Sequence, residues 1–242
     1  MRLLGILLIS MLSLATVQGQ KLGDLLGKAK KVLGGESLSN DEIGMGLKEA
    51  LNIGTGEAVD FLSAEDGFYK SIYQIALPEE AQQIVKKLTL VPGFGNLEKD
   101  LIERMNRAAE LAAKKAKPIF VSAIKGLTFK DVTNILMGEQ DAATRYLEVT
   151  TNEQLYSEFR PAIASALDEV NARSLWKDAV TAYNKLPFVK KTNPDLDDHV
   201  TKKSLVGVFS LIEKKEEGIR TDVGQRSSDL LQKVFAKQDN TK

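Results

Sequence analysis

The residues whose types and spacing could do chemistry lie close together near the C-terminus. Arg220, Asp222 and Arg226 fall where one predicted helix ends and the next begins. Two guanidinium groups near a helix start can hold a carboxylate or a phosphate, because free backbone amides at that end also favour anions. Alternatively, the arginines tie down the turn by pairing with Asp222 or Asp229, and this is the interpretation we favour. The cluster is therefore predicted to be either a structural clamp or an anion-binding site.

A further candidate is Asn106, which lies at the edge of an apolar helical stripe beside Met105. A buried amide needs hydrogen-bond partners. It can find them in a bound ligand or in a neighbouring helix, and a helix–helix hydrogen bond is the favoured interpretation. The candidate ligand-binding residues are thus Asn106, Arg220, Asp222 and Arg226.

The single histidine and the absence of cysteine exclude several kinds of active site. A cysteine nucleophile is impossible, and a zinc site with three nitrogen or sulfur ligands cannot be built. A Ser-His-Asp triad would have to use His199, which we expect to be a polar residue in the first turn of a helix. No nucleophile elbow, Walker loop, dinucleotide-binding fingerprint or HExxH motif is present. The sequence therefore nominates no catalytic residue and no cofactor.

The acidic residues Asp195, Asp197 and Asp198 invite a calcium interpretation, since hard cations bind clustered carboxylates. The EF-hand pattern fails, because Val200 stands where its glycine belongs and Val206 where its glutamate belongs. Carboxylates in a first helical turn also stabilise the helix through its dipole. We therefore expect a helix start here and no metal site.

Helical periodicity runs through the chain and predicts an all-α fold, a single globular domain of about ten helices. Ser-x-x-Glu at Ser39 and Thr-x-x-Gln at Thr151 look like capping boxes. Kinks are expected at Pro118 and Pro161. The expected helices span about 24–33, 39–62, 78–90, 97–116, 128–138, 141–149, 151–170, 174–185, 196–220 and 227–236.

Two of these segments carry most of the packing prediction. The helix at 97–116 has a clean apolar stripe, with Arg107 and Glu110 on its opposite, polar face. The helix at 196–220 has apolar residues on more than one face, so we expect it at the centre of the core. Residues 69–77 alternate like a strand, but a lone strand makes no sheet, so we expect an extended connector.

The N-terminus has the layout of a secretory signal peptide. Arg2 precedes the uncharged apolar run Leu3–Val17, and Gly19 offers a cleavage site. The run is shorter than the roughly 20 residues that a membrane-spanning helix needs. The predicted organisation is a signal peptide at 1–19, an amphipathic segment at 20–38, a helical domain at 39–236 and a polar tail at 237–242. The mature protein is expected to be periplasmic or secreted, with no transmembrane segment after cleavage.

Charge excludes some partners. The chain carries 33 basic and 33 acidic residues, and they are well mixed along the sequence. Nothing indicates the basic stripe that nucleic acid requires, or a polybasic membrane-binding surface. The remaining partner classes are an envelope protein or a small ligand, neither of which the sequence identifies.

Several short stretches together resemble the bacterial domain-of-unknown-function family 4197. The resemblance extends from about Ser39 to Phe235, and it rests on Gly46–Leu51, Met105–Glu110, Ala116–Phe120, Asp141–Thr144, Asp195–Asp198, Ile219–Asp222 and Asp229–Phe235. It implies an exported bacterial helical protein and brings no activity with it. The chain differs from lipoprotein members of the family in lacking the lipid-bearing cysteine.

These observations predict an exported, non-catalytic binding or interaction protein of the cell envelope. Two alternatives stay open. One is a hydrolase that acts on an envelope polymer with a pair of carboxylates, which must then converge in one cleft. The other is a purely structural envelope protein.

Overall fold

The computed structural model describes residues 39–236, which fold into helices connected by turns and loops. No strand occurs within this range, so the predicted all-α, single-domain fold is confirmed. The predicted signal peptide at 1–19, the amphipathic segment at 20–38 and the tail at 237–242 lie outside the described residues. Within the described range, no helix combines the length and the apolar character needed to cross a membrane.

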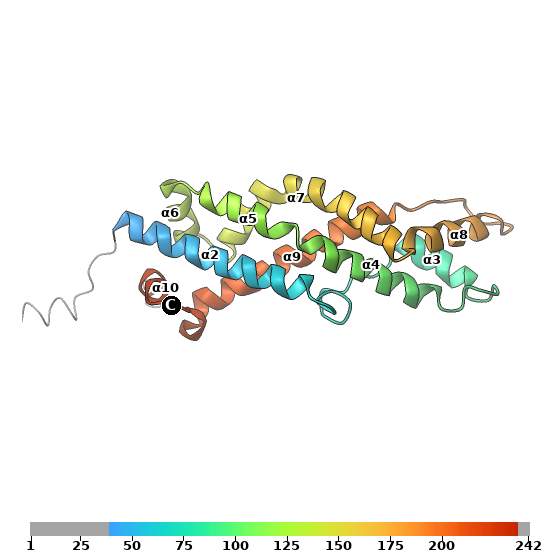
Figure 1. Ribbon diagram of the computed structural model, residues 1–242, viewed down its shortest axis with the longest axis horizontal. Helices are drawn as coiled ribbons and strands as arrows, with labels where there is room; N and C mark the ends of the chain where they lie inside the picture. The colour runs from blue at the N-terminus through green and yellow to red at the C-terminus, as the bar shows by residue number, and fades with distance from the viewer. Residues whose placement is uncertain (1–38, 237–242) are drawn as a thin grey trace, which may run out of the picture. The chain divides into compact units, whose positions relative to one another are not determined.

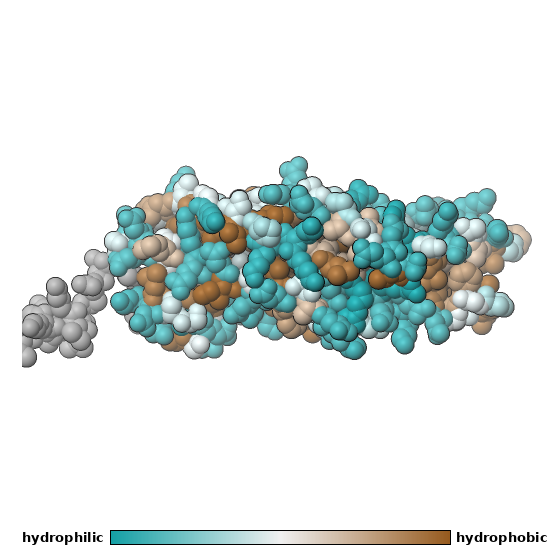
Figure 2. All heavy atoms as spheres, viewed as in Figure 1, coloured by the Kyte–Doolittle hydropathy of each residue, from teal (hydrophilic) through white to brown (hydrophobic). Residues whose placement is uncertain are grey.

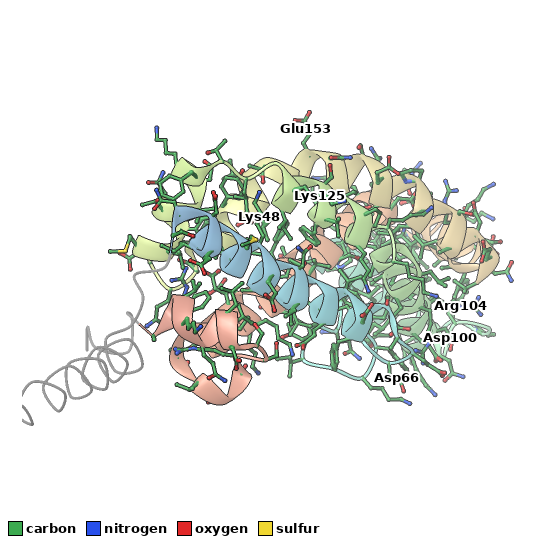
Figure 3. All side chains as sticks on the ribbon, turned by 60° about the vertical axis from the view of Figure 1, so that its left-hand side comes forward. Lys48, Asp66, Asp100, Arg104, Lys125 and Glu153 are labelled. Atoms are coloured by element: carbon green, nitrogen blue, oxygen red, sulfur yellow. The ribbon has the colours of Figure 1, made fainter. Side chains whose placement is uncertain are left out.

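Four long helical rods form the main bundle, and the second rod is interrupted (Figure 1). The rods are α2 (Asn40–Ser63), α4 (Leu97–Ala113) followed by α5 (Ala116–Lys125), α7 (Ala142–Glu169) and α9 (Leu196–Thr221). Neighbouring rods pack along their lengths, with α2 and α7 both against α9 and the α4–α5 rod against α2 and α7. Lys48 of α2 donates a hydrogen bond to the carbonyl of Lys125 at the end of α5 (Figure 3).

Shorter helices cover the two ends of this bundle. At one end α3 and α8 pack against each other and against α4, and at the other α6 and α10 pack on α2 (Figure 1). Their bounds are α3 (Glu79–Leu88), α6 (Phe129–Met137), α8 (Ala172–Asn184) and α10 (Asp229–Phe235), and a short 3-10 turn, η1 (Val223–Gln225), precedes α10.

Helix α9 is central, as its apolar pattern predicts. It packs against α2, α4 and α7, and its buried residues lie on more than one face. Phe209 is buried, and its ring meets that of Phe120 edge to face with 5.9 Å between the ring centroids. The helix begins where predicted, because the carboxylate of Asp195 accepts the amide of Asp198 and so caps it.

The observed helices around Pro118, Thr151 and Pro161 differ in their boundaries from those predicted. The rod of α4 ends at Ala113, so Pro118 lies in the first turn of α5, where a missing amide costs nothing. Pro161 lies within α7, which continues past it to Glu169. The expected break between 149 and 151 is wrong. Thr151 is buried in the middle of α7, and its hydroxyl donates to the carbonyl of Leu147 instead of capping a new helix.

Helices α2 and α10 approach closely at Gly46. A methyl group built on Gly46 would lie 2.5 Å from Cγ2 of Val234, too close for any real contact. Glycines inside a helix can mark a break or the close approach of a neighbour. Helix α2 runs unbroken from Asn40 to Ser63, and Gly46 admits α10.

Candidate functional site

The predicted arginine cluster centres on an ion pair between Arg220 and Glu216, both buried on α9. Arg220 donates from Nε and Nη2 to the Glu216 carboxylate at 2.9 and 2.8 Å. Its Nη2 also donates to the carbonyl of Ile135 at the end of α6, at 2.8 Å. The guanidinium therefore ties α6 to α9.

The same glutamate binds the start of α7. Its two carboxylate oxygens accept the amides of Ala143 and Thr144 at 2.9 and 2.8 Å, and one also accepts the Thr144 hydroxyl at 2.8 Å. A carboxylate there is favoured by the helix dipole and by the otherwise unpaired amides. Asp141, which directly precedes this helix, makes no side-chain cap bond and pairs with Arg145. The cap is supplied by α9, from 72 residues away in sequence.

Arg226 and Asp222 hold the turn between α9 and α10. Arg226 is buried, donates to the carbonyls of Ile219 and Arg220, and lies over the Phe235 ring. Asp222 is exposed and accepts the amide of Gly224 at 2.8 Å, which caps η1. The carboxylate that holds Arg220 is thus Glu216, one turn earlier on α9, and not Asp222 or Asp229, the two partners predicted. This geometry favours the clamp interpretation.

Asn106 is buried and makes three hydrogen bonds. Its Oδ1 accepts the amide of Ile75 at 2.7 Å, and its Nδ2 donates to the carbonyls of Ile75 and Ile102. The partner is the connector between α2 and α3 and not a helix, which corrects the helix–helix prediction. This connector is a series of turns up to Tyr73 and irregular from Gln74 to Pro78, so the extended conformation expected for 69–77 is wrong for its first part. An amide is the side chain that can satisfy both backbone groups of one residue. Asn106 therefore fastens the connector to α4.

Glu110 corrects a second prediction, because it is buried and not on a polar surface. The chain after α2 folds over this face of α4, so the carboxylate accepts the amides of Phe68 and Tyr69, each at 3.1 Å. Arg107 bridges Glu110 to Asp66, whose position Figure 3 marks. The hydrogen bonds from Lys70 and Arg107 lower the pKa of Asp66.

Only a small hollow adjoins the Glu216–Arg220 pair. Its volume is about 20 Å³, and its walls are almost wholly apolar. This is room for about one water molecule. This hollow beside Arg220 and Glu216 is therefore too small for a ligand larger than water.

A much larger polar groove lies between α7, α8 and residues 193–197, which lead into α9. Its volume is about 1060 Å³. We call it the α7–α8 groove; its charged and aromatic lining residues include Arg160, Asp168, Arg173, Trp176, Asp195 and Asp197.

Ion pairs organise this groove. Arg160 of α7 pairs with Asp195 at 2.9 Å. Arg173 lies between two carboxylates, with Nη1 at 2.7 Å from Asp168 and Nε at 3.6 Å from Asp197. The groove thus brings together carboxylates from α7 and from the start of α9 and holds each beside an arginine.

Hydrogen bonds fix the loop that forms one wall. The indole of Trp176 donates to the carbonyl of Pro194 at 3.1 Å. Asn184 binds both backbone groups of Thr192, donating to its carbonyl and accepting its amide. The wall is therefore built before any ligand arrives, as binding sites usually are.

The surroundings of Asp197 in the groove shift its pKa. Partial burial raises its pKa above the ordinary value of 3.8, and the nearby Arg173 works in the opposite direction. Asp198 faces away, towards Tyr156 and Lys202, and their hydrogen bonds lower its pKa. Across residues 39–236, no group of three or more acidic or histidine side chains is arranged to hold a metal ion.

His199 lies at a second hollow of about 530 Å³, between residues 72–79 and α9. Its Nε2 lies 2.8 Å from the carbonyl oxygen of Ala76. The imidazole therefore fastens the connector to α9, and His199 lies in the first turn of that helix as predicted.

Most residues of the α7–α8 groove were not singled out from the sequence. Arg160, Asp168 and Arg173 stand in ordinary helical positions, where a charged residue is usually solvated. The available signals were Trp176, the only tryptophan in the chain, and the polar stretch at 193–197. The aspartates of that stretch drew attention as possible metal ligands, but their partners are arginines.

A comparison with known protein families shows to which family the chain belongs. The family described as "Protein of unknown function (DUF4197)" matches residues 37–236. The chain belongs to the DUF4197 family. Two of the stretches that carried the resemblance, Met105–Glu110 and Ile219–Asp222, contain Asn106, Glu110 and Arg220, which in this DUF4197 protein hold the scaffold together. No curated protein and no solved structure matches the chain significantly.

Proposed function

We propose that this DUF4197 protein is a non-catalytic binding protein of the bacterial cell envelope. Its α7–α8 groove would take a neutral, hydroxyl-rich ligand such as a segment of an envelope glycan. The observation that carries the proposal is the groove itself, a polar hollow of about 1060 Å³ with a prearranged wall.

The composition of the groove supports a neutral polar ligand. Its cationic side chains Arg160, Arg173 and Lys177 are balanced in number by Asp168, Asp195 and Asp197. Between these charges lie hydroxyl and amide groups, which donate and accept hydrogen bonds equally well. The side chains of this kind are Ser174, Thr181 and Asn193.

Binding is favoured over catalysis because the carboxylates are already engaged. Hydrolysis by two carboxylates requires one free base or nucleophile opposite one acid. Asp168 and Asp195 each pair with an arginine, and Asp195 also caps α9. The envelope location rests on the predicted signal peptide at 1–19 and on the family resemblance.

A hydrolase is the second candidate, and Asp197 is the observation that favours it. A partly buried carboxyl group with a raised pKa, in a groove with two more carboxylates, has the properties of a general acid.

Trp176 offers a direct test, because the only tryptophan of the chain lines the groove. We would titrate the protein with soluble peptidoglycan glycan strands and follow tryptophan fluorescence. Binding predicts a saturable change. It should weaken in the double variant Lys177→Ala, Thr181→Ala, whose side chains line the groove. Asp178→Ala is the matched control, because Asp178 is exposed on α8 and does not line the groove.

The alternatives predict different outcomes. A hydrolase would shorten the strands during incubation, and Asp197→Asn would stop that turnover while leaving binding in place. A purely structural protein would give no fluorescence response at any strand concentration, and that result would refute the proposed binding function.

A further inference from the structure

Two loops at one end of the bundle leave neighbouring helices. Residues 89–96 follow α3 and residues 185–195 follow α8, and these two helices pack against each other. In Figure 1 both loops lie at the right-hand end of the view. Residues nearly a hundred positions apart in sequence therefore form one end of the domain.

Each loop exposes a large apolar side chain. Leu90 is 93% exposed, and Phe188 is fully exposed. In Figure 2 apolar residues are visible at this end, as they are along the rest of the same face. Phe188 also has a backbone φ of 63°, the left-handed region that a bulky residue rarely adopts. Strained backbone of this kind persists mostly at functional positions.

Every charged residue in the sequence stretches around Leu90 and Phe188 is a lysine, up to Asp195, which ends the second loop and pairs with Arg160. The stretches 86–96 and 184–194 contain five lysines and no acidic residue: Lys86, Lys87, Lys185, Lys190 and Lys191. All five are exposed, and none forms a salt bridge within residues 39–236. We call the two apolar residues and the five lysines together the lysine-flanked tip.

We propose that the lysine-flanked tip binds the surface of a membrane that contains anionic phospholipid. Leu90 and Phe188 would enter the boundary between headgroups and acyl chains, where apolar side chains are favoured. The lysines would contact the anionic headgroups, each strengthening binding. The charge of the tip complements that surface, and a fluid bilayer accepts projecting side chains without a matching hollow.

This inference does not depend on the glycan proposal. The tip shares no residue with the lining of the α7–α8 groove, although the two share a loop. A protein that bound both would sit at the membrane surface and reach a polymer beside it. If the fluorescence titration at Trp176 showed no glycan binding, the membrane proposal would be unaffected. If the vesicle experiment showed no membrane binding, the glycan proposal would be unaffected.

The lack of cysteine allows a local test on the full chain. An environment-sensitive NBD dye is attached to Leu90→Cys, where the apolar dye replaces the apolar side chain. The matched control carries the dye at Val149→Cys, an exposed apolar position of α7. A local dye is needed because the apolar residues 3–17 can bind vesicles by themselves.

With vesicles of equal parts phosphatidylglycerol and phosphatidylcholine, the dye at residue 90 should shift its emission to shorter wavelength and become shielded from iodide. The dye at residue 149 should do neither. Phosphatidylcholine vesicles alone should give a far weaker response. Lys190→Gln with Lys191→Gln should weaken binding by about 25-fold, or about fivefold per lysine. Phe188→Ser should weaken it by at least about tenfold.

Three results would overturn the proposal. The dye at residue 90 could stay exposed at every vesicle concentration, or respond equally to both vesicle types. Alternatively, soluble polyglutamate could produce the same emission shift and shielding as the vesicles, which would assign the tip to an acidic protein. Circular dichroism of each variant, unchanged from the parent, would exclude unfolding as the cause of any loss.

Discussion

Replacing Glu216 by glutamine tests whether the buried ion pair is a clamp. The carboxylate accepts hydrogen bonds from the start of α7 and from Arg220, and both charged side chains are buried. Glutamine keeps the size and one acceptor oxygen. It also points an NH₂ group at neighbours that are themselves donors, and it leaves the Arg220 charge buried without its counterion.

The cost follows from these contacts. Removing one partner of a buried ion pair costs about 3–5 kcal/mol, because the remaining charge stays uncompensated. Arg220→Gln should cost less, about 1–3 kcal/mol. In that variant Glu216 keeps the amides of Ala143 and Thr144, and they continue to stabilise its charge. We therefore expect the glutamate to be the more sensitive partner.

Urea unfolding of both variants and of the parent measures the difference. Glu213→Gln is the matched control, because Glu213 is an exposed residue of α9 that pairs with Arg145. Surface pairs of this kind contribute less than about 1 kcal/mol. The clamp would be refuted if Glu216→Gln cost no more than this control. It would also be refuted if phosphate stabilised the parent, while Arg220→Gln with Arg226→Gln cost nothing, since both results locate an anion site.

Three further predictions concern the connector, the core and the groove. Asn106→Leu should cost about 2–5 kcal/mol in urea unfolding, because it leaves the buried amide and carbonyl of Ile75 without partners; a loss below about 1 kcal/mol would mean that the connector is not held there. Phe209→Ala should cost about 3–5 kcal/mol through the cavity left beside Phe120, and a loss below about 1 kcal/mol would contradict the packing. Burial raises the pKa of Asp197, so its contribution to stability is present below its ordinary pKa of 3.8 and is lost as pH rises through the raised value. The Asp197→Asn variant should therefore lose less stability than the parent as the pH rises from acidic to neutral, as measured by urea unfolding. Equal losses in the two proteins would contradict the raised pKa of Asp197.

Local signals predicted much of the fold. The helix starts predicted at Thr128 and Asp195 are each stabilised by a cap that acts within four residues, so the sequence alone indicates them. The apolar stripe of α4 was likewise readable from helical spacing. Thr151 misled, because a hydroxyl group can cap a new helix or bond back within an existing one, and the pattern is the same in both cases.

The sites could not be predicted in the same way, because their partners are distant in sequence. Glu110 was predicted to lie on the surface, but residues 64–77 fold over it. Glu216 caps a helix that begins 74 residues earlier in the sequence. The α7–α8 groove joins residues of three separate segments. The lysines at 86–87 and 185–191 appeared evenly mixed along the chain, and only the packing of α3 on α8 gathers them.

The close approach of α10 to Gly46 has a consequence for the order of assembly. The face of α2 around Gly46 and Leu47 is covered by residues from the C-terminal part of the sequence, chiefly α9 and α10. A chain that emerges N-terminus first, from a ribosome or through a translocation channel, cannot bury this face until about residue 235 has emerged. Until then, the apolar side of α2 is open to chaperones, and a chain truncated before α10 would present it permanently to proteases.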